Sequence, residues 1–237
     1  MKAMILAAGL GTRFKPWTDK HPKALAVING KSLLQRNIEY LQNAGIYDVV
    51  VNVHHYADQI EDAVLMNNGW GSKIIISDER DVVLETGGGL LKASPYLMED
   101  SFVLMNVDIL TGLDLKEMIN SHRKLMPLAT LATTDRNTSR YFLFDHLDNL
   151  CGWVNMKTGE EKIIKTTADR KLKAFSGIHV IDPRIFTLIR QEGKFSMVDV
   201  YLSLAGDEII KSFDHSDTKF IDVGKPEAVA AAEKLFK

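Results

Sequence analysis

The first half of the chain alternates short apolar runs with segments of helical periodicity, and this alternation restricts the fold more than any other feature. Four runs have the length and composition of strands, at residues 2–7, 48–53, 73–77 and 101–108. Apolar residues recur at helical spacing in residues 32–44, 57–66, 88–97 and 115–125. Parallel strands need crossover helices of this kind, so the pattern predicts an α/β fold: a mainly parallel, mixed sheet between two helical layers.

The rhythm changes after Pro127, where strand-like segments follow one another with little helix between them. We expect strands at residues 128–133, 141–144, 171–181, 208–213 and 218–223. Helices are predicted at residues 183–191, 196–204 and 226–236. No linker or low-complexity tract separates the two parts. The sequence therefore predicts one domain over residues 1–237, whose second half extends the same sheet.

Charge and cysteine content exclude several classes of protein. The 29 Lys and Arg residues nearly balance 31 Asp and Glu, so no basic excess suggests a nucleic-acid partner. No apolar stretch has the 18 or more residues of a membrane helix, and the N-terminal run is too short for a secretory signal. The one cysteine, Cys151, forms neither an internal disulfide nor a paired-cysteine metal site. We expect a cytoplasmic protein without nucleic-acid or membrane partners.

A glycine-rich segment follows the first predicted strand. Gly9 and Gly11 at a strand end allow backbone N–H groups to approach a phosphate closely. Phe14 occupies the third glycine position of a dinucleotide-binding motif and therefore disfavours a nicotinamide-dependent oxidoreductase. Arg13 and Lys23 lie in the same proline-stiffened loop, and two cations beside backbone donors suit a triphosphate.

These residues form a long motif that resembles the signature of the sugar-1-phosphate nucleotidyltransferases. The loop matches it at Gly9, Gly11, Thr12, Arg13, Pro16, Thr18, Pro22 and Lys23. Three further segments fit the family, at residues 84–89, 106–108 and 220–224. The Glu-Thr-Gly-Gly-Gly run and residues 175–178 are most similar to the N-acetylmuramate-1-phosphate uridylyltransferases of peptidoglycan recycling. Mannose-1-phosphate guanylyltransferases are also similar.

The resemblance implies a Rossmann-like, GT-A-like fold and an Mg²⁺-dependent reaction between an NTP and a sugar 1-phosphate. Residues 1–126 would form the nucleotide-binding half, and residues 127–237 the sugar-phosphate half with a closing strand and helix. Because the sugar phosphate is already anionic, no general base is needed, and none stands out in the sequence. The length also predicts a stand-alone transferase without the β-helical domain that several relatives carry.

The resemblance assigns roles to individual residues. Arg13, Lys23 and Asp108 are the expected catalytic residues, and Asp108 and Asp222 the expected Mg²⁺ ligands. The expected nucleotide contacts are Ala8, Gly9, Gly11, Thr12, Arg13, Lys23, Glu85, Thr86, Gly87 and Asn106. Gly88 and Gly89 are expected to bring backbone close to the base or ribose. Arg140, Trp153, Ser176 and Gly177 are the expected sugar-phosphate contacts.

The chemistry of Glu85 leaves the base open, since a carboxylate accepts a hydrogen bond from uracil N3–H or from guanine N1–H and N2–H. UTP is favoured by resemblance alone, and GTP with mannose 1-phosphate is the first alternative. A phosphocholine cytidylyltransferase and a catalytically inactive nucleotide-sugar sensor are weaker alternatives. The sensor is disfavoured because Arg13, Lys23, Asp108 and Asp222 are all present.

Overall fold

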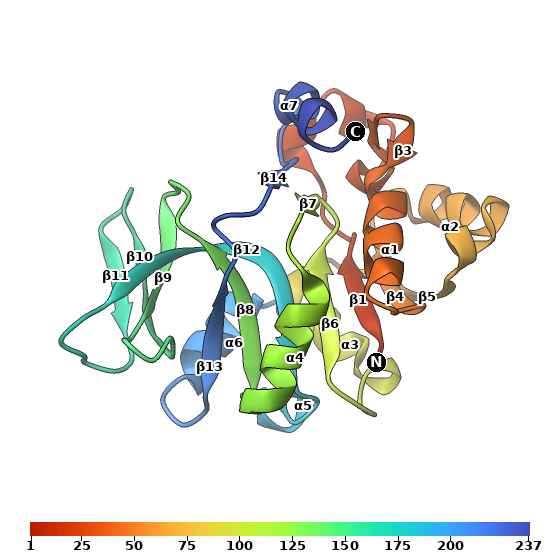
Figure 1. The fold of residues 1–237 in the computed structure, drawn as a ribbon. Helices are drawn as coiled ribbons and strands as arrows, with labels where there is room; N and C mark the ends of the chain where they lie inside the picture. Colours follow the sequence, from red (N-terminus) through yellow and green to blue (C-terminus); the bar gives the residue numbers. More distant parts are fainter.

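The computed structural model describes residues 1–237 (Figure 1). Its strands are β1 (Ala3–Leu6), β2 (Val27–Ile28), β3 (Lys31–Ser32), β4 (Asp48–Val53), β5 (Lys73–Asp78), β6 (Phe102–Asn106), β7 (Ile109–Thr111), β8 (Ala129–Thr134), β9 (Arg140–Phe144), β10 (Leu150–Asn155), β11 (Glu160–Ile163), β12 (Lys171–Ile181), β13 (Ile210–Asp214) and β14 (Phe220–Asp222). The α-helices are α1 (Leu33–Asn43), α2 (Ala57–Met66), α3 (Glu85–Lys92), α4 (Leu115–Leu125), α5 (Ile185–Leu188), α6 (Met197–Leu204) and α7 (Ala228–Leu235).

Ten strands form one continuous sheet that runs through both halves of the chain. Its order is β11-β10-β9-β12-β6-β1-β4-β5, and β8 pairs with both β12 and β13. The strands β6, β1, β4 and β5 are parallel, whereas β12 is antiparallel to β6, β8 and β9. The expected mixed α/β sheet is confirmed; its parallel strands are concentrated in the first half of the chain and its antiparallel strands in the second.

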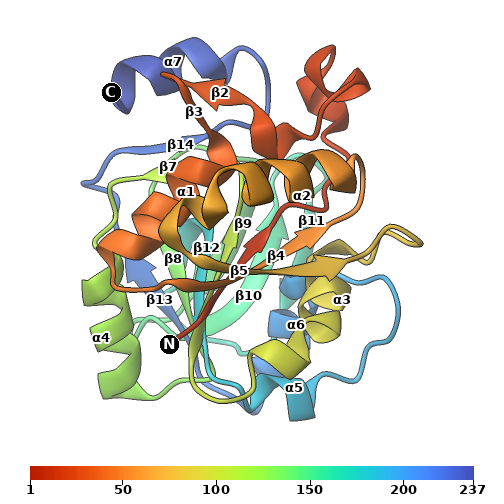
Figure 2. The ribbon, with the colours of Figure 1, turned by 90° about the vertical axis from the view of Figure 1, so that its right-hand side faces the viewer.

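Helices cover both faces of the sheet (Figures 1 and 2). Ala3 and Ile5 of β1 pack into one buried cluster with α1, α2, α4 and α7. Met4, which points to the opposite face, packs into a second cluster with α3, α5 and α6. Alternate side chains of a strand face opposite sides, so a strand buried on both faces must be apolar throughout. The apolar runs of the first half satisfy this condition.

A small antiparallel pair outside the main sheet links the two halves of the chain. β14, near the C-terminus, pairs with β7, which follows β6 directly, and Asp222 lies opposite Ile109. The closing helix α7 sits beside β2, where the amide of Asn29 donates to the carbonyl of Glu233 at 2.7 Å (Figure 2). This arrangement brings the end of the chain to the end of β6.

Three sequence expectations differ from the structure. The helix expected at 88–97 begins earlier, at Glu85, and ends at Lys92. The helix expected at 183–191 is reduced to Ile185–Leu188. The hairpin β10–β11 was missed because β11 is exposed along its whole length and has no apolar periodicity. None of the helices is long and apolar enough to span a membrane.

Candidate active site

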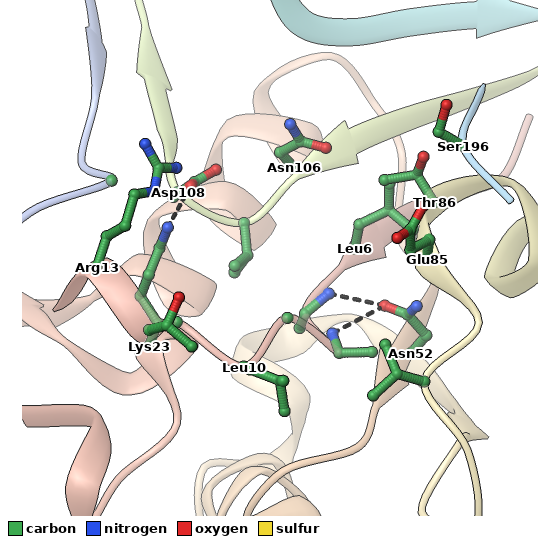
Figure 3. A pocket seen from close by; sticks show the side chains of 18 of the residues that line it. Leu6, Leu10, Arg13, Lys23, Asn52, Glu85, Thr86, Asn106, Asp108 and Ser196 are labelled. Carbon is green, nitrogen blue, oxygen red and sulfur yellow. Dashed lines mark hydrogen bonds and ion pairs between the residues drawn. The ribbon is translucent and has the colours of Figure 1, made fainter. Parts of the chain in front are cut away.

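A cavity of about 520 Å³ opens at the carboxyl ends of β1, β4 and β6 (Figure 3). Open parallel sheets bind ligands at this end of their strands. The cavity has two chemically different sides. Arg13, Lys23 and Asp108 lie on one side, and Glu85, Thr86 and Ser196 lie on the other, with the glycine loop between them. The remaining lining residues are Leu6, Ala7, Ala8, Gly9, Leu10, Gly11, Thr12, Asn52, Val83, Asn106, Val107, Lys194 and Gly224.

The glycine loop is shaped by two different requirements. Gly11 has a φ of +60°, and a Cβ atom there would lie 2.7 Å from Cγ2 of Thr18, so a larger residue is excluded by conformation and by space. The hydroxyl of Thr18 donates to the carbonyl of Gly11 at 2.9 Å and holds the turn. Gly9 has no atom within 4 Å of its Cβ direction, and it borders the cavity. Open space at Gly9 leaves room for a ligand against the backbone.

Asn52, at the end of β4, holds the start of the glycine loop through hydrogen bonds. Its Oδ1 accepts from the N–H groups of Ala7 at 2.7 Å and Ala8 at 3.3 Å, and its Nδ2 donates to Oε1 of Glu79 at 2.7 Å. The N–H of Ala8 already donates to Asn52, so the expected contact of Ala8 with the nucleotide would use its other atoms. Glu79 is buried, and this burial raises the pKa of its carboxyl.

The charged side of the cavity contains an ion pair that the sequence did not reveal. The ammonium of Lys23 contacts Oδ2 of Asp108, and both side chains are largely buried. Lys23 begins a short 3-10 helix after Pro22, whereas Asp108 follows β6. Arg13 lies on the same side of the cavity, in the 3-10 turn after Gly11 (Figure 3).

Asp222 reaches this charged cluster through the β7–β14 pair. The N–H of Val223 donates to the carbonyl of Asp108 at 2.8 Å, which places the two aspartates side by side. A Cβ atom at Gly224 would lie 2.7 Å from Oδ1 of Asp222 and 3.3 Å from a guanidinium nitrogen of Arg13. Burial of the carboxyl and the neighbouring Asp108 raise the pKa of Asp222, and the nearby cations oppose this shift. Asp108 and Asp222 are the pair that could hold a divalent cation, and no group of three metal-binding side chains occurs.

The opposite side of the cavity is formed by α3 and by residues 193–197, which are joined by backbone hydrogen bonds. The N–H of Gly87 donates to the carbonyl of Phe195 at 2.9 Å, and the N–H of Phe195 donates to the carbonyl of Leu84 at 3.2 Å. The N–H of Met197 donates to the hydroxyl of Thr86 at 2.9 Å. Residues 193–197 are therefore held against the start of α3.

The three consecutive glycines of α3 make this contact possible. A Cβ atom at Gly87 would lie 2.4 Å from the ring of Phe195, and one at Gly88 would lie 2.2 Å from the carbonyl oxygen of Gly193. A Cβ atom at Gly89 would lie 2.7 Å from Oε1 of Glu79. These glycines are buried, and the space on the Cβ side of each is occupied by protein atoms. Their expected approach to a base or ribose stays a prediction.

The expected sugar-phosphate residues lie outside the main cavity. The hydroxyl of Ser176 is buried against Nε2 of His215 at 2.8 Å, so only its backbone is available to a substrate. Gly177 gives space to Asn106, whose amide nitrogen would lie 2.8 Å from a Cβ atom there. Arg140 is exposed at the start of β9, and Trp153 is half-buried on β10 with Lys162 above its ring.

Arg136, which was not predicted from the sequence, is a less exposed cation than Arg140 and interacts with Asp222. It is half-buried, it donates to the carbonyl of Phe175 at 2.8 Å, and its guanidinium stacks over the ring of Phe220 at 4.8 Å. Burial lowers the pKa of Arg136 and the charge of Asp222 opposes this shift, so the two charged groups interact electrostatically. An arginine remains charged at all ordinary pH values. Asp222 is thus flanked by cations from two loops.

Ten of the expected residues line one cavity, and three lining polar residues were not expected. The ten are Ala8, Gly9, Gly11, Thr12, Arg13, Lys23, Glu85, Thr86, Asn106 and Asp108. Asn52 carried a usable signal, since it is the one polar residue inside an otherwise apolar strand. Lys194 and Ser196 have no local signal, because only the contact between distant segments brings them to the cavity.

Comparisons with known proteins agree with this geometry. A sequence model of the family described as nucleotidyl transferase matches residues 2–235. The N-acetylmuramate alpha-1-phosphate uridylyltransferase of Caulobacter vibrioides is 31% identical over 98% of this chain and 95% of its own length. The mannose-1-phosphate guanyltransferase of Yarrowia lipolytica is 29% identical over 100% of this chain, which spans 64% of that protein. The structure of HddC from Yersinia pseudotuberculosis complexed with GMP-PN has a TM-score of 0.77 at 26% identity, covering 100% of this chain and 99% of that one.

Proposed function

This chain belongs to the nucleotidyl transferase family, and on that premise we propose that it uses UTP to convert N-acetylmuramate 1-phosphate or a similar amino-sugar phosphate into a UDP-sugar. It is a sugar-1-phosphate nucleotidyltransferase, which releases pyrophosphate from a nucleoside triphosphate. The observation that carries the assignment to this cavity is that Arg13, Lys23 and Asp108 line one side of it, with Asp222 held beside Asp108.

The chemistry requires two anions to meet. An oxygen of the sugar phosphate attacks the α-phosphorus, a new phosphorus–oxygen bond forms, and the bond to pyrophosphate breaks. Charge neutralisation and positioning supply the catalysis, since the attacking oxygen is already ionised. We infer that Arg13 neutralises the leaving pyrophosphate and that Lys23 contacts the α-phosphate. The open backbone at Gly9 and the turn at Gly11 leave space for the phosphates between these cations and α3.

We further propose that Mg²⁺ is held by Asp108 and Asp222. The donor set fits, because Mg²⁺ takes one or two protein carboxylates and fills its other positions with water and phosphate oxygens. Burial and, after it, the charge of Asp108 raise the pKa of Asp222, and a divalent cation would stabilise the two neighbouring carboxylates. When bound, the ion would neutralise charge on the phosphates.

The choice of UTP and an amino sugar rests on similarity to the Caulobacter vibrioides uridylyltransferase. The second candidate, GTP with mannose 1-phosphate, is favoured by the Yarrowia lipolytica relative and by the GMP-PN complex of HddC. We also propose a cytoplasmic location and a role in peptidoglycan recycling, both on the first similarity.

One experiment distinguishes these candidates. The purified chain is incubated with each of UTP, GTP, CTP and ATP against N-acetylmuramate, N-acetylglucosamine, mannose and glucose 1-phosphates, and pyrophosphate release is measured. We expect the highest kcat/KM with UTP and N-acetylmuramate 1-phosphate. Asp108→Asn and Asp222→Asn should each lower it by about 10²-fold or more. Unchanged pyrophosphate release in both variants would exclude this mechanism.

A further inference from the structure

Glu85 and Lys194 form a charged pair at the side of the cavity opposite Arg13 and Lys23. Nζ of Lys194 lies 3.6 Å from Oε1 of Glu85, and both residues line the cavity. Both side chains are about half exposed, so the ion pair itself adds little stability. A weak pair that faces a cavity is free to exchange its internal contact for contacts with a ligand.

The backbone under this pair is fixed although the side chains are open. Residues 193–197 are held to α3 by the hydrogen bonds of Phe195 and Met197, and Gly88 permits the close approach of Gly193. Glu85 adopts a φ of +60°, a left-handed conformation that a side chain rarely takes and that persists only where neighbours impose it. A carboxylate acceptor and an ammonium donor are thus presented together from a rigid wall.

The position of the pair decides which part of a nucleotide it meets. Glu85 and Thr86 lie across the glycine loop from Arg13 and Lys23 (Figure 3). If the phosphates are bound by Arg13 and Lys23, the base is directed toward α3. The phosphate contacts then restrict how far the base can slide along the wall, so each group of the pair faces one position of the base.

We propose that Glu85 and Lys194 together select bases with a keto–imide edge: uracil, thymine or guanine. The carboxylate of Glu85 accepts from the ring N–H, and the ammonium of Lys194 donates to the adjacent carbonyl oxygen. This inference rests on the proposed function for the direction of the nucleotide. It names Lys194 as a residue that determines specificity.

Cytosine and adenine present the opposite pattern at the same two positions. Their ring nitrogen is an acceptor and their exocyclic amine is a donor. Glu85 would therefore face a lone pair, and Lys194 would face an N–H group, leaving polar groups unpaired in the bound state. The pair distinguishes keto bases from amino bases but does not separate uracil from guanine.

The test measures binding of UTP, GTP, CTP and ATP to the full chain by calorimetry, and pyrophosphate release in parallel. The variants are Lys194→Met, Glu85→Gln and the charge exchange Glu85→Lys with Lys194→Glu. Lys165→Met is the matched control, since Lys165 is an exposed lysine that does not line the cavity. We expect the unmodified chain and the control to prefer keto nucleotides by at least about tenfold.

The variants should change selectivity rather than overall affinity. Lys194→Met and Glu85→Gln should each bring the affinities for keto and amino nucleotides to within about threefold, and the charge exchange should favour CTP or ATP. The proposal is overturned if Lys194→Met weakens all four nucleotides equally, which indicates a phosphate contact, or if the preference is unchanged. Keto-selective binding that depends on Lys194, without pyrophosphate release from any sugar phosphate, would support this inference and contradict the proposed function.

Discussion

At the scale of one residue, the charge of Asp222 lowers the stability of the folded state at the site proposed to bind a cation. Its carboxylate is held beside that of Asp108, and the raised pKa of Asp222 means that folding disfavours its charged form. A group with a raised acidic pKa destabilises the folded state above that pKa. The cost disappears as the pH falls below the pKa of the unfolded chain, where both states are protonated. The sequence predicted that Asp222 ends a strand, but it did not indicate that its carboxylate lies beside that of Asp108.

We predict that Asp222→Asn stabilises the metal-free protein at neutral pH while it reduces activity. The rise in Tm should not exceed about 3 °C, because Asp222 is only partly buried and solvent screens part of its charge. Thermal unfolding in EDTA at pH 7.5 and at pH 3.5 checks the sign. The difference between the two proteins should be present at the higher pH and absent at the lower. A variant less stable than the parent at pH 7.5 would show that the two carboxylates do not oppose folding.

Arg136 and Arg140 offer a matched comparison for the sugar phosphate. Arg140 is exposed, whereas Arg136 is half-buried and its charge interacts with that of Asp222. We expect Arg136→Gln to raise KM for the sugar 1-phosphate by about tenfold, with little change in KM for the NTP. Arg140→Gln should change either value by less than about twofold. Initial-rate measurements with each substrate varied in turn give both constants. The reverse ranking would return the role to Arg140.

At the scale of elements, the contact between α3 and residues 193–197 builds one wall of the cavity. The glycine run lies inside a helix that begins at Glu85, before the start at residue 88 that the sequence predicts. Helix is possible there because the glycines are used for packing, and tertiary contacts compensate for their poor helix propensity. The same contact carries Lys194 and Ser196 to the cavity.

We predict that Gly88→Ala destabilises the protein by about 1–2 kcal/mol. The methyl group would meet the carbonyl oxygen of Gly193 at 2.2 Å, and this clash outweighs the better helix propensity of alanine. Gly9→Ala is the control, since no atom lies within 4 Å of its Cβ direction. Its stability should stay within about 0.5 kcal/mol of the parent. Urea unfolding of both variants measures the difference, and equal midpoints would refute the packing role of Gly88.

At the scale of the whole molecule, the cavity joins segments from both halves of the chain. The strands β1, β4 and β6 supply its floor, whereas Lys194, Ser196 and Gly224 come from the second half. The sheet is continuous across the two halves, and β14 returns to pair with β7. A ligand bound in this cavity contacts segments that separate only when the chain unfolds.

We therefore expect a bound nucleotide to stabilise the whole chain in one cooperative transition. With Mg²⁺ and UTP at about one hundred times the dissociation constant, the gain is about 2.7 kcal/mol, or about 5–10 °C in Tm. EDTA should remove most of this shift in the parent protein. Asp108→Asn should show a small shift that EDTA does not change. A shift in the parent that is insensitive to EDTA would contradict the proposed metal site.

The sequence alone determined the features that depend on neighbouring residues. Apolar periodicity identified the four parallel strands of the first half, because strands buried on both faces are apolar throughout. The loop from Gly9 to Lys23 indicated a phosphate site, because its glycines and cations lie within one short segment. The exposed strand β11 and the early start of α3 were not predicted, since neither has a local apolar pattern.

Only the tertiary structure decided which distant segments meet. Asp108 and Asp222 are more than a hundred residues apart in the chain, and so are Glu85 and Lys194. Their proximity follows from the β7–β14 pairing and from the packing of residues 193–197 on α3. Periodicity and motifs record how each residue is placed relative to its neighbours in sequence. The order of strands and the contacts between loops depend on the free energy of the whole packed core, which no single segment contains.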